Sequence, residues 1–291
     1  MSGLLQEMAG KALKLGTPLS VHLDVTYRCN ERCVHCYLDH EDHGEMTTTE
    51  IKDLLEQLAG AGVFFLTLSG GEILLRKDFF EILEYARELT FCVKLKSNAI
   101  MIREEEAQRI RSLGVESIQV SIYSHRPAVH DAITKVKGSL KRSLDAIRFL
   151  KSYGLKVIIA NVLMTQNYQD YPGVRALAAE IGVPCALDPT ITPKMDGDRS
   201  VLNLNVDRSA LEQVFRDQSL VGNVTEFCAT SQKPDDDELE SLPQEFRPKP
   251  VTHAGIEDPG SDALRKFPRT KKTVDSDLTA CNNACSGLER R

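Results

Sequence analysis

Short runs of apolar and β-branched residues alternate with longer segments of helical periodicity between about residues 20 and 192. The runs predict six strands, at residues 20–26, 63–69, 92–97, 117–123, 156–164 and 185–192. The segments between them predict helices at residues 47–60, 77–88, 103–113, 139–153 and 171–181. Two strands, VFFLTLS and KVIIANVLM, are apolar almost throughout, as strands covered on both faces are. The pattern therefore predicts an α/β domain built on a parallel sheet.

The ends of the predicted helices carry their own signals. Thr47 precedes the first of these helices, and Glu50 follows three residues later, which makes a capping box. Glycines follow four of the five helices closely, where a left-handed residue ends a helix. They are Gly62, Gly114, Gly154 and Gly182.

Six consecutive β-α units fit two architectures, a doubly wound open sheet and a six-unit open barrel. The hydrophobic pattern leaves both open. In either one, ligands bind at the carboxyl ends of the strands. Residues that follow the strands directly are therefore the first candidates for a functional site.

The rest of the chain has a different character. Residues 1–17 have the spacing of a short amphipathic helix, and residues 18–192 form the predicted core. Residues 193–232 are expected to be a packing segment with a short helix near 209–216. Residues 233–291 are rich in proline and charge, with little periodicity, so a tail of low order is expected there.

Composition narrows the class of protein. The chain has 291 residues, 42% of them hydrophobic and 27% charged, which is ordinary for a globular domain. Its net charge of -6 argues against a nucleic-acid partner, since phosphates require basic side chains. No apolar run approaches the roughly 18 residues of a membrane span. We expect a cytoplasmic protein without a membrane or nucleic-acid partner.

Three of the eight cysteines follow the first predicted strand with the spacing C-x3-C-x2-C. Cys29, Cys33 and Cys36 can supply three ligands of a [4Fe–4S] cluster, which leaves one iron open for a substrate or cosubstrate. The alternative is a structural zinc site, in which His35, His40 or His43 adds a fourth ligand. The position at the carboxyl end of a strand favours the cluster, because active sites lie there.

A second motif, SGGE, follows the second predicted strand. Gly70 and Gly71 permit unusual backbone angles and close approach of a ligand, and Glu72 adds a carboxylate that can receive an ammonium group. Alone, the motif is also compatible with an ordinary strand-to-helix turn. Parallel strands place it beside the cysteine loop.

The pair CNERCVHCY and SGGE resembles the radical S-adenosylmethionine (SAM) superfamily, over roughly residues 18–192. The resemblance implies a partial (β/α)6 TIM-like barrel with an irregular C-terminal extension. It also implies that Cys29, Cys33 and Cys36 bind a [4Fe–4S] cluster whose open iron chelates SAM. The GGE segment, residues 70–72, would bind the SAM amino group. One departure is Ile73, where the family usually has proline.

Further SAM contacts follow from the same resemblance. Ser97 and Asn98 occupy the place of the TNG of relatives, which implies ribose or carboxylate contacts. Ser121 matches a strand-four serine that often contacts SAM. Asn161 and Met164 on strand five, and the backbone near Tyr37, are the candidates for adenine. Ser97 and Ser121 can equally be ordinary alternating strand residues, and the alternative for the Tyr37 ring is packing. No catalytic residue is assigned.

The implied activity is reductive cleavage of SAM to a 5′-deoxyadenosyl radical that abstracts hydrogen from a C–H bond. The sequence also resembles the SPASM-type subgroup, which matures peptides and cofactors such as pyrroloquinoline quinone. This implies a peptide substrate and an electron donor such as flavodoxin or ferredoxin. The auxiliary clusters of that subgroup need more than Cys228, Cys281 and Cys285, so the extension is expected to be truncated or degenerate.

Two alternatives stay open from the sequence. One is a zinc-binding structural or regulatory protein on the same fold. The other is a pseudoenzyme that keeps the barrel and the cluster without the activity.

Overall fold

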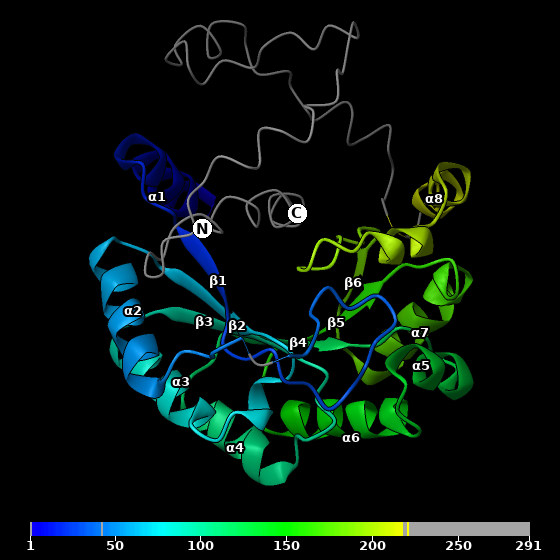
Figure 1. Cartoon of the computed structure of the whole chain (residues 1–291), viewed down its shortest axis with the longest axis horizontal. Coiled ribbons are helices and arrows are strands. Elements are labelled where there is room, and N and C mark those ends of the chain that lie inside the picture. Colours follow the sequence, from blue (N-terminus) through cyan, green and yellow to red (C-terminus); the bar gives the residue numbers. More distant parts are fainter. Residues whose placement is uncertain (1, 42, 218–219, 221–291) are drawn as a thin grey trace, which may run out of the picture. The chain divides into compact units, whose positions relative to one another are not determined.

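The computed structural model describes residues 2–41, 43–217 and 220. It divides the chain into two units, Met1–Arg208 and Ser209–Arg291. The first unit contains one parallel six-stranded sheet, in which the strands are ordered as in the sequence (Figure 1). The strands are β1 (Ser20–Asp24), β2 (Phe65–Ser69), β3 (Cys92–Ser97), β4 (Ser117–Ser121), β5 (Val157–Val162) and β6 (Cys185–Asp188). The order confirms the α/β partial barrel and excludes a doubly wound sheet, whose strand order would reverse.

All the predicted helices are present, and one further α-helix and three short 3-10 helices join them. The first unit has α1 (Ser2–Leu15), α2 (Thr48–Gly60), α3 (Phe79–Glu88), α4 (Glu104–Ser112), α5 (Pro127–Thr134), α6 (Ser139–Ser152) and α7 (Tyr171–Ile181). Its 3-10 helices are η1 (Ile73–Leu75), η2 (Tyr168–Asp170) and η3 (Ser200–Leu204). The helix α8 (Arg208–Phe215) matches the short helix expected near 209–216.

Only some of the predictions for the C-terminal part of the chain fall on residues that the structure describes. The first part of the predicted packing segment contains η3. Residues 221–291 lie outside the described residues, and with them Cys228, Cys281, Cys285 and the whole tail predicted to be of low order, residues 233–291. The boundaries predicted at residues 192 and 232 stay predictions. Among the described residues, no helix has the length and apolar composition that a membrane crossing requires.

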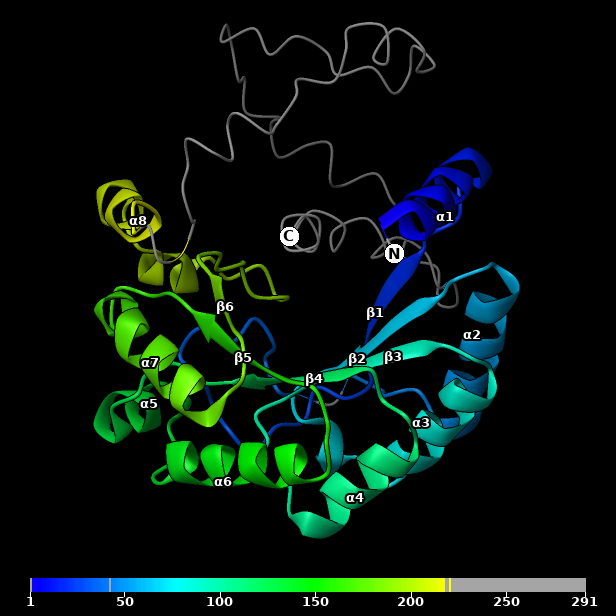
Figure 2. The same cartoon turned by 180° about the vertical axis from the view of Figure 1, so that it is seen from behind.

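The main core lies between the sheet and the helices that cover its outer face (Figure 2). Strand β3 shows the alternation: Val93 and Leu95 are fully buried in that core, whereas Lys94 and Lys96 are half-buried on the opposite, concave face. Helices α2, α3, α4 and α6 supply the other wall with their apolar stripes. Burial of the outer face explains why the strands are rich in apolar residues. The concave face of the sheet carries polar side chains such as those of Lys94 and Lys96.

The predicted helix ends are confirmed. Thr47 caps α2, and both halves of its capping box with Glu50 are formed. Gly62, Gly114, Gly154 and Gly182 all have positive φ, between 66° and 91°. Glycine adopts this conformation at little cost.

The backbone pairing of β1 with β2 continues beyond both strands. The Gly71 N–H donates to the Thr26 carbonyl at 2.7 Å, and the Glu72 N–H donates to the Arg28 carbonyl at 2.8 Å. A Cβ atom on Gly70 or Gly71 would lie 2.3 Å from one of these carbonyl oxygens. Both positions therefore need glycine so that residues 70–72 can meet the backbone of the loop after β1.

Helix α5 was not expected, because its eight residues are too few for a periodic pattern. Pro127 opens it, which suits the first turn of a helix. His130, on this helix, is almost fully buried, and its Nδ1 accepts a hydrogen bond from the Tyr123 N–H at 3.1 Å. Burial lowers the pKa of His130 to about 4. His130 is thus a neutral acceptor that holds α5 against the end of β4.

Replacing Gly71 by alanine is expected to destabilise the protein by at least about 1–3 kcal/mol, because the added methyl overlaps the Arg28 carbonyl. Gly60→Ala is the matched control, since no atom lies within 4 Å of its Cβ position. That change should be neutral or slightly stabilising. Urea unfolding measures both. Equal unfolding free energies for the two variants would contradict the close backbone contact.

The pH dependence of stability is expected to include a contribution from His130. Its folded pKa of about 4 lies below the usual 6.5, so protons bind the unfolded chain more readily. The contribution is complete above pH 6.5 and is lost as the pH falls toward 4. Between about pH 7 and about pH 5, the wild type should lose about 2 kcal/mol more than His130→Gln. Parallel losses in urea unfolding would rule out this role.

Candidate functional site

The loop between β1 and α2 carries the three clustered cysteines, and its two ends are tied together by Arg76. This arginine is almost fully buried and donates at 2.8 Å to the carbonyls of Val25 and Met46, which flank the loop. Asp78 accepts two hydrogen bonds of 2.9 Å from the same guanidinium. The bidentate ion pair fixes the orientation of Arg76, so the loop begins and ends at a defined place.

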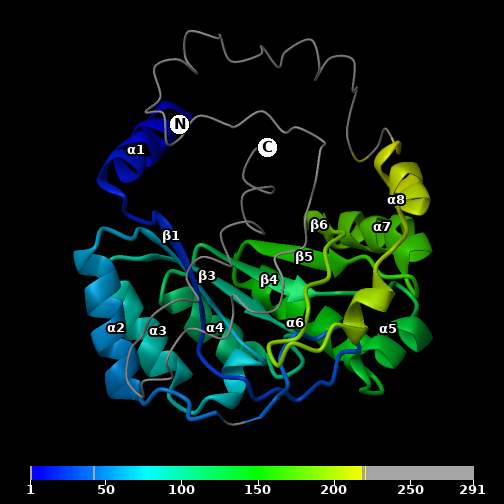
Figure 3. The same ribbon diagram turned by 45° about the horizontal axis from the view of Figure 1, so that its top comes forward.

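The middle of the loop lies against the carboxyl-end connections of the later strands (Figure 3). The N–H groups of Arg32 and Val34 each donate at 3.0 Å to the end of α5, to the carbonyls of Thr134 and Ile133. The carbonyl of Tyr37 accepts a hydrogen bond of 2.9 Å from Met195, which follows β6. The cysteine loop therefore crosses the edge of the sheet where ligands of such folds bind.

Each of the three thiols is partly buried and hydrogen-bonded to the protein, and the Cys33 thiol donates to Glu31 Oε2 at 3.4 Å. Cys29 Sγ accepts from the Glu31 N–H at 3.4 Å and from the Asn98 side-chain amide at 3.7 Å. The Leu38 N–H bonds Cys36. Burial raises the pKa of all three thiols, that of Cys29 to about 11. Protonated thiols are poor nucleophiles, and binding of a metal by these thiols would release protons.

The geometry argues against the zinc alternative. Within the described residues, which include all six zinc-ligand candidates, no three His, Cys, Asp or Glu side chains gather around one metal position. His43 instead bonds Asp39 at 2.6 Å. A tetrahedral zinc needs its ligands around one point, whereas a cubane cluster presents a separate iron to each thiolate.

Glu72 is fully buried and joins the end of β2 to the end of β3. Its two carboxylate oxygens accept from the Ser97 hydroxyl at 2.9 Å, and one of them accepts from the Asn98 N–H at 2.9 Å. Burial raises the pKa of Glu72, although these hydrogen bonds oppose the rise. The side chain predicted to receive an ammonium group is thus occupied by β3. Its contact with the SAM amino group stays a prediction.

Asn98 connects this carboxylate to the cysteine loop. Its side-chain amide donates to Asn30 at 2.7 Å as well as to the Cys29 sulfur. The structure therefore brings five of the predicted site residues, Gly70, Gly71, Glu72, Ser97 and Asn98, together with the first cysteine. Their roles toward SAM stay predictions.

Ser121 reaches the cysteine loop through a residue that the sequence did not single out. The hydroxyl of Tyr123 is hydrogen-bonded to Ser121 and to the Cys33 thiol. Tyr123 is almost fully buried, and its ring stacks on His130 with centroids 5.5 Å apart. Its position just after β4 was the available signal. A tyrosine in an apolar run is, however, more often a packing residue.

The three residues predicted to contact adenine, Tyr37, Asn161 and Met164, have different neighbours from one another. The Tyr37 hydroxyl donates to Asp24 at 2.7 Å. Asn161 is buried and donates to the Ile122 carbonyl at 2.7 Å, while its own Oδ1 has no partner. Met164 packs in a second apolar cluster with Tyr123 and Ile133. The predicted contacts of these three residues with adenine stay predictions.

Two further carboxylates were also missed, of which Asp24 is half-buried and Glu31 is buried. Asp24 ends β1, and hydrogen bonds from His22, Tyr37 and Ser69 overcome burial and hold its pKa below the usual value. Glu31 stands between the first two cysteines and is 2% exposed. Burial raises its pKa to about 7, and its Oε1 has no partner. Only the folded loop shows that Glu31 is buried.

The residues present fit a [4Fe–4S] cluster with SAM. Cys29, Cys33 and Cys36 would hold the cluster, and hydrogen bonds to their sulfurs are the usual means of tuning such a group. Unpartnered buried acceptors on Glu31 and Asn161 are available to donors of a bound molecule. Such atoms are rare in folded proteins, because an unsatisfied buried polar group is costly.

Comparisons with curated proteins find relatives of similar sequence. The mycofactocin maturase MftC of Mycolicibacterium smegmatis is 31% identical over 171 residues, which cover 58% of this chain and 43% of that protein. The pre-heme d1 synthase of Dinoroseobacter shibae is 34% identical over 172 residues, 58% of this chain and 42% of that protein. The PqqA peptide cyclase of Rhodopseudomonas palustris is 29% identical over 178 residues, which cover 60% of this chain and 47% of that protein. The chain thus matches less than half of each.

Solved structures share the fold. Streptococcus suis SuiB bound to S-adenosylmethionine superposes with a TM-score of 0.58 at 17% identity, over 75% of this chain and 52% of that chain. Native anSMEcpe with bound AdoMet and Cp18Cys peptide superposes with a TM-score of 0.57 at 16% identity, over 71% of this chain and 62% of that chain. The family model of the radical SAM superfamily matches residues 23–178, from the first strand into α7. Since this match spans more than half of the sequence and contains both motifs, the chain belongs to the radical SAM superfamily.

Proposed function

We propose that this protein reductively cleaves SAM at a [4Fe–4S] cluster held by Cys29, Cys33 and Cys36. When bound, the cluster and SAM supply a 5′-deoxyadenosyl radical for hydrogen abstraction from a C–H bond. The observation that carries the proposal is the junction at the carboxyl edge of the sheet, where Asn98 bonds the Cys29 sulfur and Glu72 bonds Asn98.

The chain's own residues would position these groups and protect them from water. Arg76 and the glycine pair fix the loop that bears the thiols. Glu72 holds the end of β3, so the Asn98 amide stays directed at Cys29. The apolar cluster of Tyr123, Ile133 and Met164 packs against Cys33 and excludes water on that side. Exclusion of water protects a reactive intermediate from side reactions.

The substrate class we propose is a peptide or a precursor of a cofactor. The names of relatives support it: a mycofactocin maturase, a PqqA peptide cyclase and a pre-heme d1 synthase. SuiB, which shares the fold, has a structure with its precursor peptide SuiA. The matched part covers less than half of each curated relative, so the activity of the whole protein is included in this proposal.

The reaction also needs a one-electron donor, for which we propose a flavodoxin or a ferredoxin. A reducing compartment such as the cytoplasm suits the site, because five cysteines of the described chain are free thiols. An oxidising compartment would favour disulfides over the thiolates that bind iron.

Cys33→Ala is expected to abolish both cluster assembly and SAM cleavage, because two thiolates cannot hold the cubane. Cys92→Ala, which removes a strand cysteine outside the loop, is the matched control and should keep both. After anaerobic reconstitution, iron content, the visible spectrum and the electron paramagnetic resonance of the reduced protein report the cluster. Chromatography reports 5′-deoxyadenosine.

Different failures of this experiment have different meanings. Cleavage that survives in Cys33→Ala would refute the ligand assignment. A colourless wild type with one zinc would establish the structural alternative. A wild type that assembles and reduces its cluster but leaves SAM intact would be a pseudoenzyme.

A further inference from the structure

The backbone of Asn98, directly after β3, is held by two buried side chains. Its N–H donates to the Glu72 carboxylate at 2.9 Å, and its carbonyl accepts from the Ser143 hydroxyl of α6 at 2.7 Å. Glu72 and Ser143 are both buried, and Asn98 itself is 8% exposed. The end of β3 is therefore fixed from the loop after β2 and from α6.

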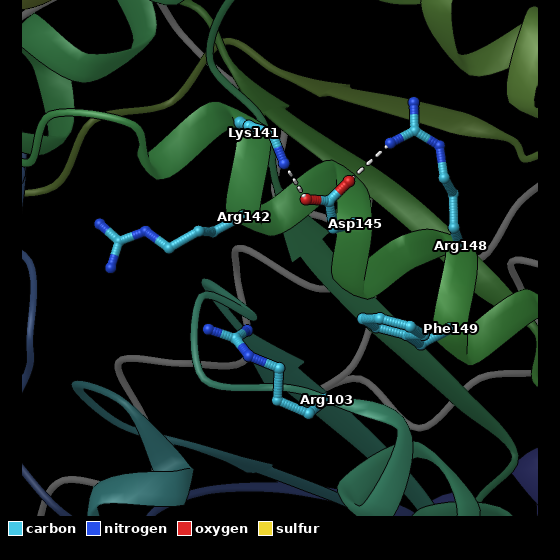
Figure 4. A pocket seen from close by; sticks show the side chains of 6 residues that line it. All are labelled: Arg103, Lys141, Arg142, Asp145, Arg148 and Phe149. Atoms are coloured by element: carbon cyan, nitrogen blue, oxygen red, sulfur yellow. Dashed lines mark hydrogen bonds and ion pairs between the residues drawn. The ribbon is translucent and has the colours of Figure 1, made fainter.

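Helix α6 makes this contact with its buried side. Lys141 and Asp145 are each two positions from Ser143, so they lie on the other side of the helix. They are bonded to each other there and line a pocket of about 440 Å³ (Figure 4). The charged side of α6 is therefore separate from the side that holds Asn98.

The side-chain amide of Asn98 has one orientation that suits its neighbours. Its Oδ1 accepts from the Ile100 N–H at 3.0 Å. A backbone N–H can only donate, so the atom opposite it must be the oxygen. The Nδ2 group therefore points the other way, where it donates to the Asn30 oxygen at 2.7 Å and to the Cys29 sulfur at 3.7 Å. These two bonds use both of its protons.

The Cys29 sulfur accepts hydrogen bonds from Asn98 and from the Glu31 N–H, the latter at 3.4 Å. The Glu31 donor belongs to the backbone, so it does not depend on the side chain at that position. The Asn98 donor is a side-chain amide that a substitution can remove. Asn98 is therefore the member of this pair through which the sequence can change the surroundings of the sulfur.

We infer that Asn98 is a positioning residue that raises the reduction potential of the proposed cluster through the Cys29 sulfur. The inference rests on the proposed function, in which Cys29 is a cluster ligand. Reduction adds one electron from an external reductant, and no bond forms or breaks. A donor to a ligand sulfur stabilises the reduced cluster more than the oxidised one, because the reduced cluster carries more negative charge. Asn98 thus makes the cluster easier to reduce.

The contacts of Asn98 separate this role from the predicted contact with the ribose or carboxylate of SAM. Each polar group of Asn98 already has a partner within the protein. A contact with SAM would have to replace one of these bonds and leave a buried partner unsatisfied, which is costly. The amide therefore serves the cysteine loop.

Asn98→Ala and Asn98→Ser test the inference. Both changes remove the donor to Cys29 without adding a charge. Serine keeps a hydroxyl oxygen that can accept from the Ile100 N–H, as Oδ1 does in the wild type. The two variants therefore differ in how well they keep the local turn, but both lack the contact with the sulfur.

Asn167→Ala is the matched control. Asn167 is 2% exposed, and its Oδ1 accepts from the Met164 N–H at 2.7 Å. Its Nδ2 donates to the carbonyls of Tyr123 and Val162, at 2.7 and 2.9 Å. This amide is as buried and as fully bonded as that of Asn98, but its partners are backbone groups and not a cysteine sulfur.

The reduction potential is measured on the anaerobically reconstituted proteins by dithionite titration followed by electron paramagnetic resonance. Both Asn98 variants should have a more negative potential than the wild type. At the wild-type midpoint, the ratio of reduced to oxidised cluster should fall about tenfold, which corresponds to about 59 mV for one electron. Asn98→Ala should lose more stability in urea than Asn98→Ser, with the same shift in potential.

Two further readings complete the test. Asn167→Ala should lose stability and keep the wild-type potential. Both Asn98 variants should bind SAM in calorimetry as the wild type does. A wild type that assembles its cluster but leaves SAM intact would refute the proposed function, and its potential would still test the role of Asn98.

Three results would overturn the inference. The first is a wild-type potential in both Asn98 variants, above all together with weaker SAM binding, which would make Asn98 a SAM contact. The second is an equal shift in Asn167→Ala, which would make the shift a consequence of lost stability. The third is that both Asn98 variants fold but take up no iron, which would assign Asn98 to the structure of the loop.

Discussion

The contact between the backbone of residues 70–71 and that of residues 26–28 is the constraint on which the site depends. Glycine is required at both positions, because any side chain would overlap a carbonyl oxygen. The contact extends the pairing of β1 and β2 past the sheet. It therefore fixes the backbone position of the residues just before Cys29. It also turns Glu72 toward β3, where its carboxylate binds Ser97 and Asn98. The cysteine, glycine and asparagine motifs are therefore one hydrogen-bonded unit.

Much of this fold could be predicted from the sequence, because the signals for its strands and helices are local. The alternation of apolar runs with amphipathic segments predicted all six strands and their neighbouring helices, since each pattern reflects burial of one face or of both. The capping box at Thr47 and the glycines after four helices are also local signals. Helix α5 was missed because a helix of eight residues gives little periodicity. The choice between barrel and open sheet required the resemblance, because it depends on strand order.

The site could be predicted only as far as its motifs. The spacing of Cys29, Cys33 and Cys36 and the SGGE segment identified the loops that meet. The sequence did not show that the Glu72 carboxylate is occupied by β3, nor that Tyr123 reaches Cys33. Arg76 was missed as well, because its partners, the carbonyls of Val25 and Met46, are some 30 to 50 positions away in sequence. Such partners are set by tertiary proximity, which no local pattern encodes.

The tie that Arg76 makes across the cysteine loop has a consequence for the order of assembly. Protein groups alone supply this tie, together with the bonds of the loop to residues 70–72 and to the end of α5. Ordering of the loop is thus part of folding the barrel, and the entropy of closing it is lost there. In small zinc domains, by contrast, metal binding provides the free energy of folding. Here, hydrogen bonds within the protein contribute to ordering the loop, so its order does not depend on the three thiols alone.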